Sequence, residues 1–202
     1  MKQTQTFHLV SKFVKKIPKG VVLDIGAGQG RNSFFLARKG FKVEAIDINK
    51  ENIKKIKQLV KKNNLPVKAK YSDVEKFKFL PSKYSLILGI QCFNFIKKSK
   101  FDKIIKRIKK SLDTDGMLII SVFTTADPTY KRLRKKYKPP EENTFYSKKF
   151  PHWWHFFKKN ELKRYFKSGY KILFYKERLV KDKKPYPHSH GIAEMVIKKL
   201  SE

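Results

Sequence analysis

The sequence is poor in cysteine and has no long hydrophobic run. Cys92 is the single cysteine among 202 residues, so no disulfide can form within the chain. A lone thiol is typical of proteins from a reducing compartment. No apolar run approaches the roughly 20 residues that a membrane-spanning helix needs, and the first residues lack the apolar segment of a signal peptide. We therefore expect a cytoplasmic protein with no membrane partner.

Acidic residues and arginine are also scarce. Asp and Glu number 17 against 49 Lys and Arg, which gives a formal net charge of +32 at pH 7, and only 7 of the 49 are Arg. So basic a chain is typical of proteins that bind nucleic acid, but phosphate and base recognition favours the forked guanidinium of Arg. Two interpretations stay open: a solvated surface that reflects compositional bias, and non-specific nucleic-acid association through the lysine-rich surface.

Glycine and proline number nine each, which excludes collagen-like and low-complexity sequence. With 40% hydrophobic residues the chain can build the core of a single domain over residues 1–202. The expected strands are 21–26, 43–47, 67–71, 84–90 and 117–123, and the expected helices are 31–39, 49–62 and 101–112. This alternation predicts an α/β fold with an open, mostly parallel sheet and helices on both faces.

The last third of the chain departs from this alternation. A polar and aromatic insertion over 127–157 precedes a predicted helix near 159–166. Residues 170–180 and 191–198 are predicted to pair as an antiparallel edge hairpin. At the other end, residues 1–19 are expected to form an N-terminal cap helix region.

Three glycines at alternate positions follow the first predicted strand, in the string LDIGAGQGRN over residues 23–32. Glycine lets the backbone approach a ligand closely, and free N–H groups at a helix start can hold an anion. A dinucleotide fingerprint reads GxGxxG, whereas this string reads GxGxG and has an acid, Asp24, two residues before it. A carboxylate there would repel a pyrophosphate and suits the amino-acid end of S-adenosylmethionine (SAM). A purely structural glycine turn is the alternative.

Two further acids follow the next predicted strands. Asp47 ends the second strand, 17 residues after Gly30 (47−30), near the spacing of about 20 at which an acid binds ribose hydroxyls. Asp73 follows the third strand, where its carboxylate can accept from the adenine amine while Val74 offers its backbone N–H. For Asp73, a helix N-cap is the competing explanation.

A family resemblance rests on these motifs. Residues 23–49 (LDIGAGQGRNSFFLARKGFKVEAIDIN) resemble motif I of class I SAM-dependent methyltransferases, and YSD, YSLILGI and LDTDGMLIISVF continue that pattern in order. GQGRNSFFLA and the C-terminal HSHGIAEMVIKKL resemble the tellurite-resistance-type small-molecule methyltransferase branch. The resemblance implies a seven-stranded, Rossmann-like methyltransferase sheet with an antiparallel last strand, and SAM as cofactor.

The resemblance and the loops around its motifs define a set of cofactor-binding residues at the predicted strand ends. The expected SAM-binding residues are Asp24, Gly26, Ala27, Gly28, Gly30, Asp47, Ile48, Asp73, Val74 and Gly89. The residues after the fourth strand lack the NPPY or DPPY string that is typical of amino-methylating nucleic-acid enzymes. This argues against N-methylation of adenine or glutamine.

Candidates for the acceptor pocket come from loops beyond the strand ends. They are Gln91, Phe93, Tyr130, Trp154, His188 and His190. Residues 150–157 contain both tryptophans and two of the five histidines. This stretch is either an aromatic lid that excludes water or a hydrophobic plug before the next helix. We expect it to close the pocket together with residues 7–14, with His188 or His190 reaching in from the last loop.

His188 and His190 share a face if they lie on a strand. Metal ligation, contact with a substrate or anion, and plain surface exposure all stay open for this pair. No Cys or further His lies near them in sequence, so we expect no metal site. No catalytic residue is identified, because methyl transfer needs mainly proximity and alignment, and a general base only where the nucleophile carries a proton.

We therefore expect a SAM-dependent methyltransferase that acts on a small-molecule acceptor, such as a thiol or an oxyanion, as a monomer or homodimer. The alternative is a methyltransferase of RNA or of an RNA-associated protein, motivated by the net charge of +32 and by the basic run over residues 131–136. A SAM-binding module without catalysis is a third interpretation.

Overall fold

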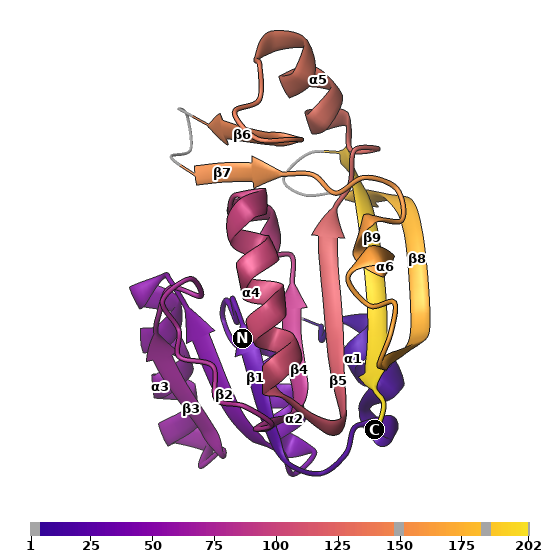
Figure 1. Cartoon of the computed structure of the whole chain (residues 1–202). Helices are drawn as coiled ribbons and strands as arrows, with labels where there is room; N and C mark the ends of the chain where they lie inside the picture. Colours follow the sequence, from indigo (N-terminus) through magenta and orange to yellow (C-terminus); the bar gives the residue numbers. More distant parts are fainter. Residues whose placement is uncertain (1–4, 148–151, 183–186, 202) are drawn as a thin grey trace.

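The computed structural model describes residues 5–147, 152–182 and 187–201. Its main feature is a seven-stranded sheet in the order β3-β2-β1-β4-β5-β9-β8 (Figure 1). The strands are β1 (Val21–Ile25), β2 (Lys42–Asp47), β3 (Val67–Tyr71), β4 (Tyr84–Ile90), β5 (Leu112–Phe123), β8 (Tyr170–Asp182) and β9 (His188–Lys199). β1 to β5 pair in parallel, whereas β9 runs antiparallel to both β5 and β8. The predicted parallel sheet and antiparallel hairpin are confirmed.

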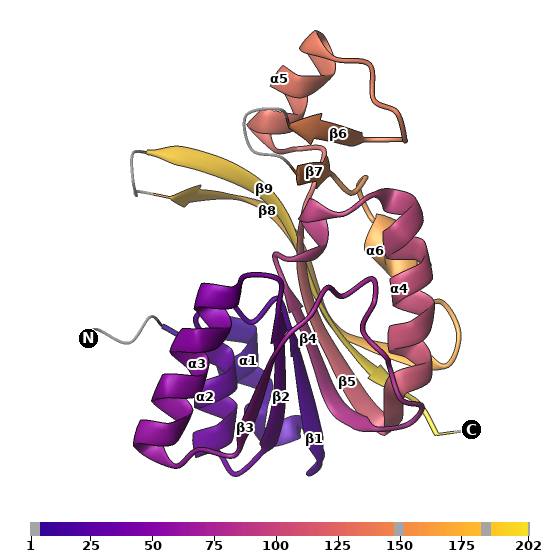
Figure 2. The same cartoon turned by 90° about the vertical axis from the view of Figure 1, so that its left-hand side faces the viewer.

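Helices cover both faces of the sheet (Figure 2). On one face lie α1 (His8–Phe13), α2 (Arg31–Arg38) and α3 (Lys50–Asn63), and on the other lie α4 (Lys98–Ser111) and the short α6 (Glu161–Arg164). Ile104, Ile105 and Ile108 of α4 are buried against the sheet, because residues three and four apart share one side of a helix. None of the helices in the described ranges is both long and apolar enough to cross a membrane.

A small unit beyond the C-terminal end of β5 fills the region predicted only as an aromatic insertion. It consists of α5 (Pro128–Lys136) and a separate two-stranded sheet of β6 (Thr144–Ser147) and β7 (His152–His155) (Figure 1). Asp127 caps α5, since its Oδ1 accepts from the backbone N of Thr129 at 2.7 Å. Tyr130 is the one buried residue of α5, so the helix has little apolar periodicity to detect in the sequence.

Two glycines allow close packing at the strand ends. A Cβ added at Gly191 would lie 2.4 Å from the backbone N of Asp127, so the start of β9 passes directly against the turn that follows β5. A Cβ added at Gly89, in β4, would lie 2.2 Å from Cε2 of Phe93. Phe93 is fully buried and packs edge-on against Phe101 at 5.3 Å between ring centroids. The packing of Phe93 therefore explains why residue 89 is a glycine.

We expect Gly89→Ala to lower the free energy of unfolding by about 1–3 kcal/mol, the usual cost of overpacking a filled core. In a Phe93→Leu background the same substitution should cost less, because the clashing ring is gone. Urea unfolding of the four proteins measures both costs. Equal costs in the two backgrounds would contradict this explanation of Gly89.

Candidate functional site

A cavity of about 290 Å³ opens at the C-terminal end of β1. It is lined by Gly26, Ala27, Gly28, Gln29, Arg31, Asn32 and Ile90. Gly28 has a φ of 56°, in the left-handed region that glycine favours. A Cβ added to it would meet no atom within 4 Å. The loop therefore holds its backbone against open space, as the predicted cofactor site requires.

Asp24 lies on β1 beneath this loop and is 2% exposed. Its Oδ2 accepts a hydrogen bond from Oγ of Ser33 at 2.6 Å, a partner that the sequence analysis did not identify. Burial raises the pKa of Asp24 to about 6, although the Ser33 hydrogen bond and the charge of Arg31 act in the opposite direction. At neutral pH the carboxylate is mostly ionised, and a buried anion beside the cavity attracts a cationic amino group.

Asp47 joins the end of β2 to the glycine loop. Its Oδ2 accepts from the backbone N of Gly28 at 2.8 Å, and its Oδ1 accepts from the backbone N of Asn49 at 2.7 Å and from Nδ2 of Asn52 at 3.4 Å. An ionised carboxylate offers about four acceptor sites, so Asp47 keeps capacity for a hydroxyl donor. The structure thus brings the residue predicted to bind ribose against the loop predicted to bind the amino-acid end.

The remaining predicted cofactor residues differ in their surroundings. Asp73 follows β3 at the same edge of the sheet, and its Oδ1 accepts from the backbone N of Glu75 at 2.8 Å. Asp73 therefore caps a turn, in line with the competing explanation, and has a second oxygen for a ligand. Val74 is partly buried beside it, and Ile48 is 66% exposed next to Asp47.

The loop after β4 contains two predicted acceptor-pocket residues, Gln91 and Phe93, and the single cysteine. Gln91 has a φ of 55° and donates its backbone N–H to the carbonyl of Ser121 at 2.8 Å. Phe93, a predicted acceptor-pocket residue, lies in the hydrophobic core between the sheet and α4. Burial raises the pKa of the Cys92 thiol, so the thiol stays protonated at neutral pH and is a poor nucleophile.

Five rings from four elements gather at the C-terminal ends of β4 and β5. We call the rings of Phe95, Phe123, His152, Trp154 and His190 the aromatic cluster. Trp154 stacks on Phe123 with centroids 5.9 Å apart, and His190 stacks on Phe123 at 4.8 Å. Phe95, from the 3-10 helix η2 (Phe93–Phe95), meets Trp154 edge-on at 5.6 Å. The structure thus brings together two predicted acceptor residues, Trp154 and His190, with two that the sequence analysis did not single out, Phe95 and Phe123.

His190 is held in place by a buried carboxylate. Its Nδ1 lies 3.0 Å from Oδ2 of Asp127, which also accepts from the backbone N of Gly191 at 3.1 Å. Asp127 is 1% exposed. The ring of His188 lies 4.9 Å from that of His190 between centroids, which confirms that the two side chains share one face of β9. With Nδ1 bound to Asp127, Nε2 of His190 is the nitrogen left for a proton or a ligand.

The N-terminal segment lies against the sheet. Leu9, Val10 and Phe13 of α1 are buried in the core with α2 and α3. Among the described residues, the segment reaches the cofactor side at its start, where the backbone N of Phe7 donates to Oδ1 of Asn32 at 3.0 Å and the carbonyl of Gln5 accepts from Arg31 at 3.4 Å. This arrangement places α1 in the helix layer that covers the sheet. The sequence analysis had instead expected residues 7–14 to form a wall of the acceptor pocket. Of the other expected wall, residues 150 and 151 lie outside the described residues.

A larger cavity of about 900 Å³ lies beside α5. It is lined by Thr125, Tyr130, Lys131, Arg134, Lys135, Pro139, Glu142, Asn143, Phe145 and Lys158. Tyr130, predicted for the acceptor pocket, lies here, and its hydroxyl donates to Oδ1 of Asn143 at 2.7 Å. Four cations against one acid make this cavity suited to an anionic group.

Comparison with known proteins identifies a family and several relatives. The family model described as "Tellurite resistance protein TehB" matches residues 1–188. A probable S-adenosyl-L-methionine-dependent methyltransferase TehB of Haemophilus influenzae is 31% identical over 107 residues, which is 52% of this chain and 37% of the relative. The ubiquinone biosynthesis O-methyltransferase of Rickettsia akari is 25% identical over 122 residues, 60% of this chain and 47% of the relative. The chain thus spans between a third and a half of these curated relatives.

Solved structures share the fold along almost the whole chain. The crystal structure of TehB from Haemophilus influenzae superposes with a TM-score of 0.76 at 25% identity and covers 98% of this chain and 64% of that one. A SAM-dependent methyltransferase from Methanosarcina mazei gives a TM-score of 0.75 at 20% identity, covering 98% of this chain and 100% of that one. The sheet with its antiparallel C-terminal strands is the class I methyltransferase fold. With the family match over residues 1–188, the chain belongs to the tellurite resistance protein TehB family.

Proposed function

We propose that this protein is a SAM-dependent methyltransferase that acts on a small-molecule acceptor. The observation that carries the proposal is the cavity that the glycine loop lines at the end of β1. Asp47 accepts from the N–H of Gly28 in this loop, and the buried Asp24 lies on β1, two residues before Gly26. This donor and acceptor set fits SAM: an anion for its amino group, backbone N–H groups for its carboxylate, and an acid for its ribose. Bound SAM supplies a methyl group on a sulfonium, which a nucleophile attacks directly.

The order of the strands sets where each part of the cofactor binds. Asp73, Asp47 and the glycine loop follow β3, β2 and β1, which are neighbours in the sheet. An elongated ligand across these three strand ends has its adenine at Asp73, its ribose at Asp47 and its amino acid above Asp24. Arg31, which lines the cavity, is placed to pair with the carboxylate of the amino acid.

The acceptor binds at the aromatic cluster, next along the same edge. The cluster is built on the segments that follow β4 and β5, and β4 is the neighbour of β1. Its rings exclude water from a compact acceptor, and Nε2 of His190, oriented by Asp127, can take a proton from one that carries it. The description of the family, tellurite resistance, favours an oxyanion acceptor, and a thiolate would suit the same aromatic surroundings.

The alternative acceptor, RNA or an RNA-associated protein, draws its support from the cavity beside α5. Lys131, Arg134, Lys135 and Lys158 line it, and phosphate groups bind to such cations. The cavity is distinct from the aromatic cluster, and its cations are mostly Lys, which binds phosphate as a point charge. A compact acceptor at the rings therefore has the stronger structural support.

Replacing Asp47 tests the cofactor site. Asp47→Ala should raise the SAM dissociation constant at least tenfold, because about 1.5–3 kcal/mol of charged hydrogen bonding is lost. Calorimetric titration of SAM measures this, and Asp115→Ala, which removes a half-exposed acid that pairs with Lys198, is the matched control. An unchanged affinity in Asp47→Ala would remove the cofactor assignment.

The raised pKa of Asp24 predicts a pH dependence. Because its folded-state pKa is about 6, the carboxyl is neutral below that pH and loses its attraction for the amino group. Relative to its value at pH 7, SAM affinity should therefore fall up to tenfold per unit below about pH 6. Asp24→Asn should bind more weakly and show no such fall. A wild-type affinity that stays flat down to about pH 5 would contradict the role of Asp24.

The two adjacent tryptophans allow a matched test of the acceptor site. Trp154 belongs to the aromatic cluster, whereas Trp153 faces the other side of β7, against Tyr146 and Lys97. Turnover to S-adenosylhomocysteine is measured with a panel of thiols, oxyanions and RNA. With the accepted substrate, Trp154→Ala should lower kcat/KM at least tenfold with unchanged SAM affinity, and Trp153→Ala should change neither. Equal effects of the two, or turnover with RNA alone, would argue against the small-molecule pocket.

A further inference from the structure

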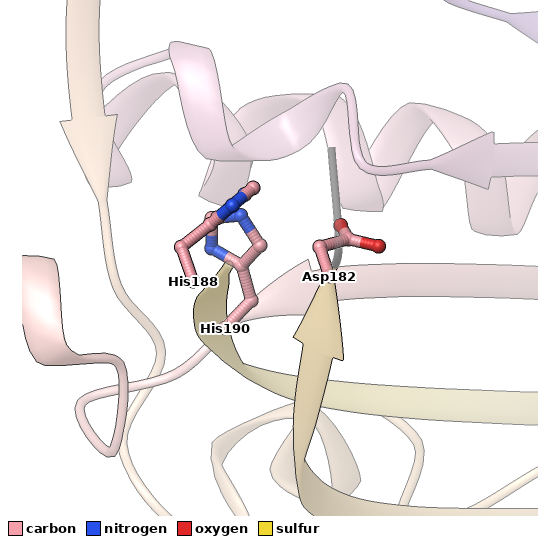
Figure 3. A group of neighbouring side chains, drawn as sticks. All are labelled: Asp182, His188 and His190. Atoms are coloured by element: carbon pink, nitrogen blue, oxygen red, sulfur yellow. The ribbon is translucent and has the colours of Figure 1, made fainter. Parts of the chain in front are cut away.

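The far end of the β8–β9 hairpin gathers three potential metal ligands. His188 and His190 on β9 lie across from Asp182 on β8 (Figure 3). Asp182 pairs with His188 in the register of the hairpin, and Val180 pairs with His190. One ligand atom from each of the three lies within 4.8 Å of those of the other two. The sequence analysis expected no metal because it looked for further Cys or His, and the third ligand is a carboxylate on the opposite strand.

A carboxylate behind one of the histidines completes the arrangement found in metal sites. Metal-bound imidazoles almost always donate their second N–H to a carboxylate or carbonyl, which fixes the tautomer and the ring. Here Nδ1 of His190 lies 3.0 Å from Oδ2 of Asp127. Asp127 is itself fixed by the N–H groups of Thr129 and Gly191. The ring of His190 also stacks on Phe123, so the ring is held in place before any ligand arrives.

The charges of the group match a divalent cation. Asp182 and Asp127 contribute two negative charges, and the two imidazoles are neutral when they ligate. This pair of carboxylates stands out on a chain whose net charge is +32. Two imidazole nitrogens and one carboxylate suit Fe²⁺, Co²⁺, Ni²⁺ or Zn²⁺, whereas Mg²⁺ and Ca²⁺ prefer oxygen ligands alone.

We propose that Asp182, His188 and His190 form a binding site for a divalent transition-metal ion, with Asp127 as the carboxylate that orients His190. Three protein ligands leave at least one coordination position open, as in sites that bind exchangeable ligands and unlike the closed four-ligand structural zinc sites. Metal binding here goes beyond the proposed methyl transfer, and it is measured without SAM or acceptor. His190 belongs to both proposals, so a metal ion bound at its Nε2 would prevent this nitrogen from taking a proton from the acceptor.

The test uses the full chain without a histidine tag, stripped of metal with a chelator. Co²⁺ is titrated and followed by its visible d–d absorption, and Zn²⁺ by competition with a chromophoric chelator. We expect one ion per chain in the wild type and no comparable binding of Mg²⁺. Asp182→Asn and His188→Gln should each weaken Co²⁺ and Zn²⁺ at least tenfold. Asp182 is exposed on the hairpin, so its replacement by a side chain of the same shape leaves the fold intact.

Two control variants remove the same chemical groups elsewhere. Glu51→Gln takes an exposed acid from α3, and His8→Gln takes a half-exposed histidine from α1. Both should bind the metals like the wild type. Zn²⁺ should also raise the Tm of the wild type and of the controls but not that of Asp182→Asn. Absence of stoichiometric binding in the wild type, or equal affinity in Asp182→Asn and Glu51→Gln, would overturn the proposal.

Discussion

Parallel pairing of β1 with β2 on one side and β4 on the other is the constraint on which the candidate site depends. Parallel strands end at the same edge, so whatever follows them in sequence meets in space. The glycine loop follows β1, and Asp47 ends β2 close enough to accept its N–H at 2.8 Å. Together with the hydrogen bond from the backbone N of Ala27 to the carbonyl of Ile46 at 3.0 Å, this contact joins two strand ends into one candidate ligand-binding edge.

The antiparallel addition of β9 extends this edge. Because β9 runs against β5, the start of β9 lies beside the end of β5, and His190 stacks on Phe123 there. Gly191 permits the close approach, since any Cβ would meet the backbone of Asp127. The candidate cofactor site at the ends of β1, β2 and β3 and the aromatic cluster at the ends of β4 and β5 therefore lie along one continuous edge of the sheet.

The sequence predicted the elements whose pattern is local. Buried parallel strands are continuous apolar runs, such as residues 84–90, and the glycine string marks its own turn. It did not predict α5, which buries only Tyr130, or the four-residue strands β6 and β7. The sequence also did not predict the side-chain contacts that depend on how the strands pair. Asp182 meets His188 only because of how β8 and β9 pair, and Phe95 meets Trp154 across nearly sixty residues of chain.

The proposed methyl transfer requires the candidate cofactor site and the aromatic cluster to serve one reaction. A crystal structure of the complex with S-adenosylhomocysteine would show whether they do. We expect adenine at Asp73, ribose hydroxyls on Asp47, the amino acid above Asp24, and the sulfur directed toward Phe95 and Trp154. A ligand bound elsewhere, or one whose sulfur points away from the aromatic cluster, would contradict this expectation.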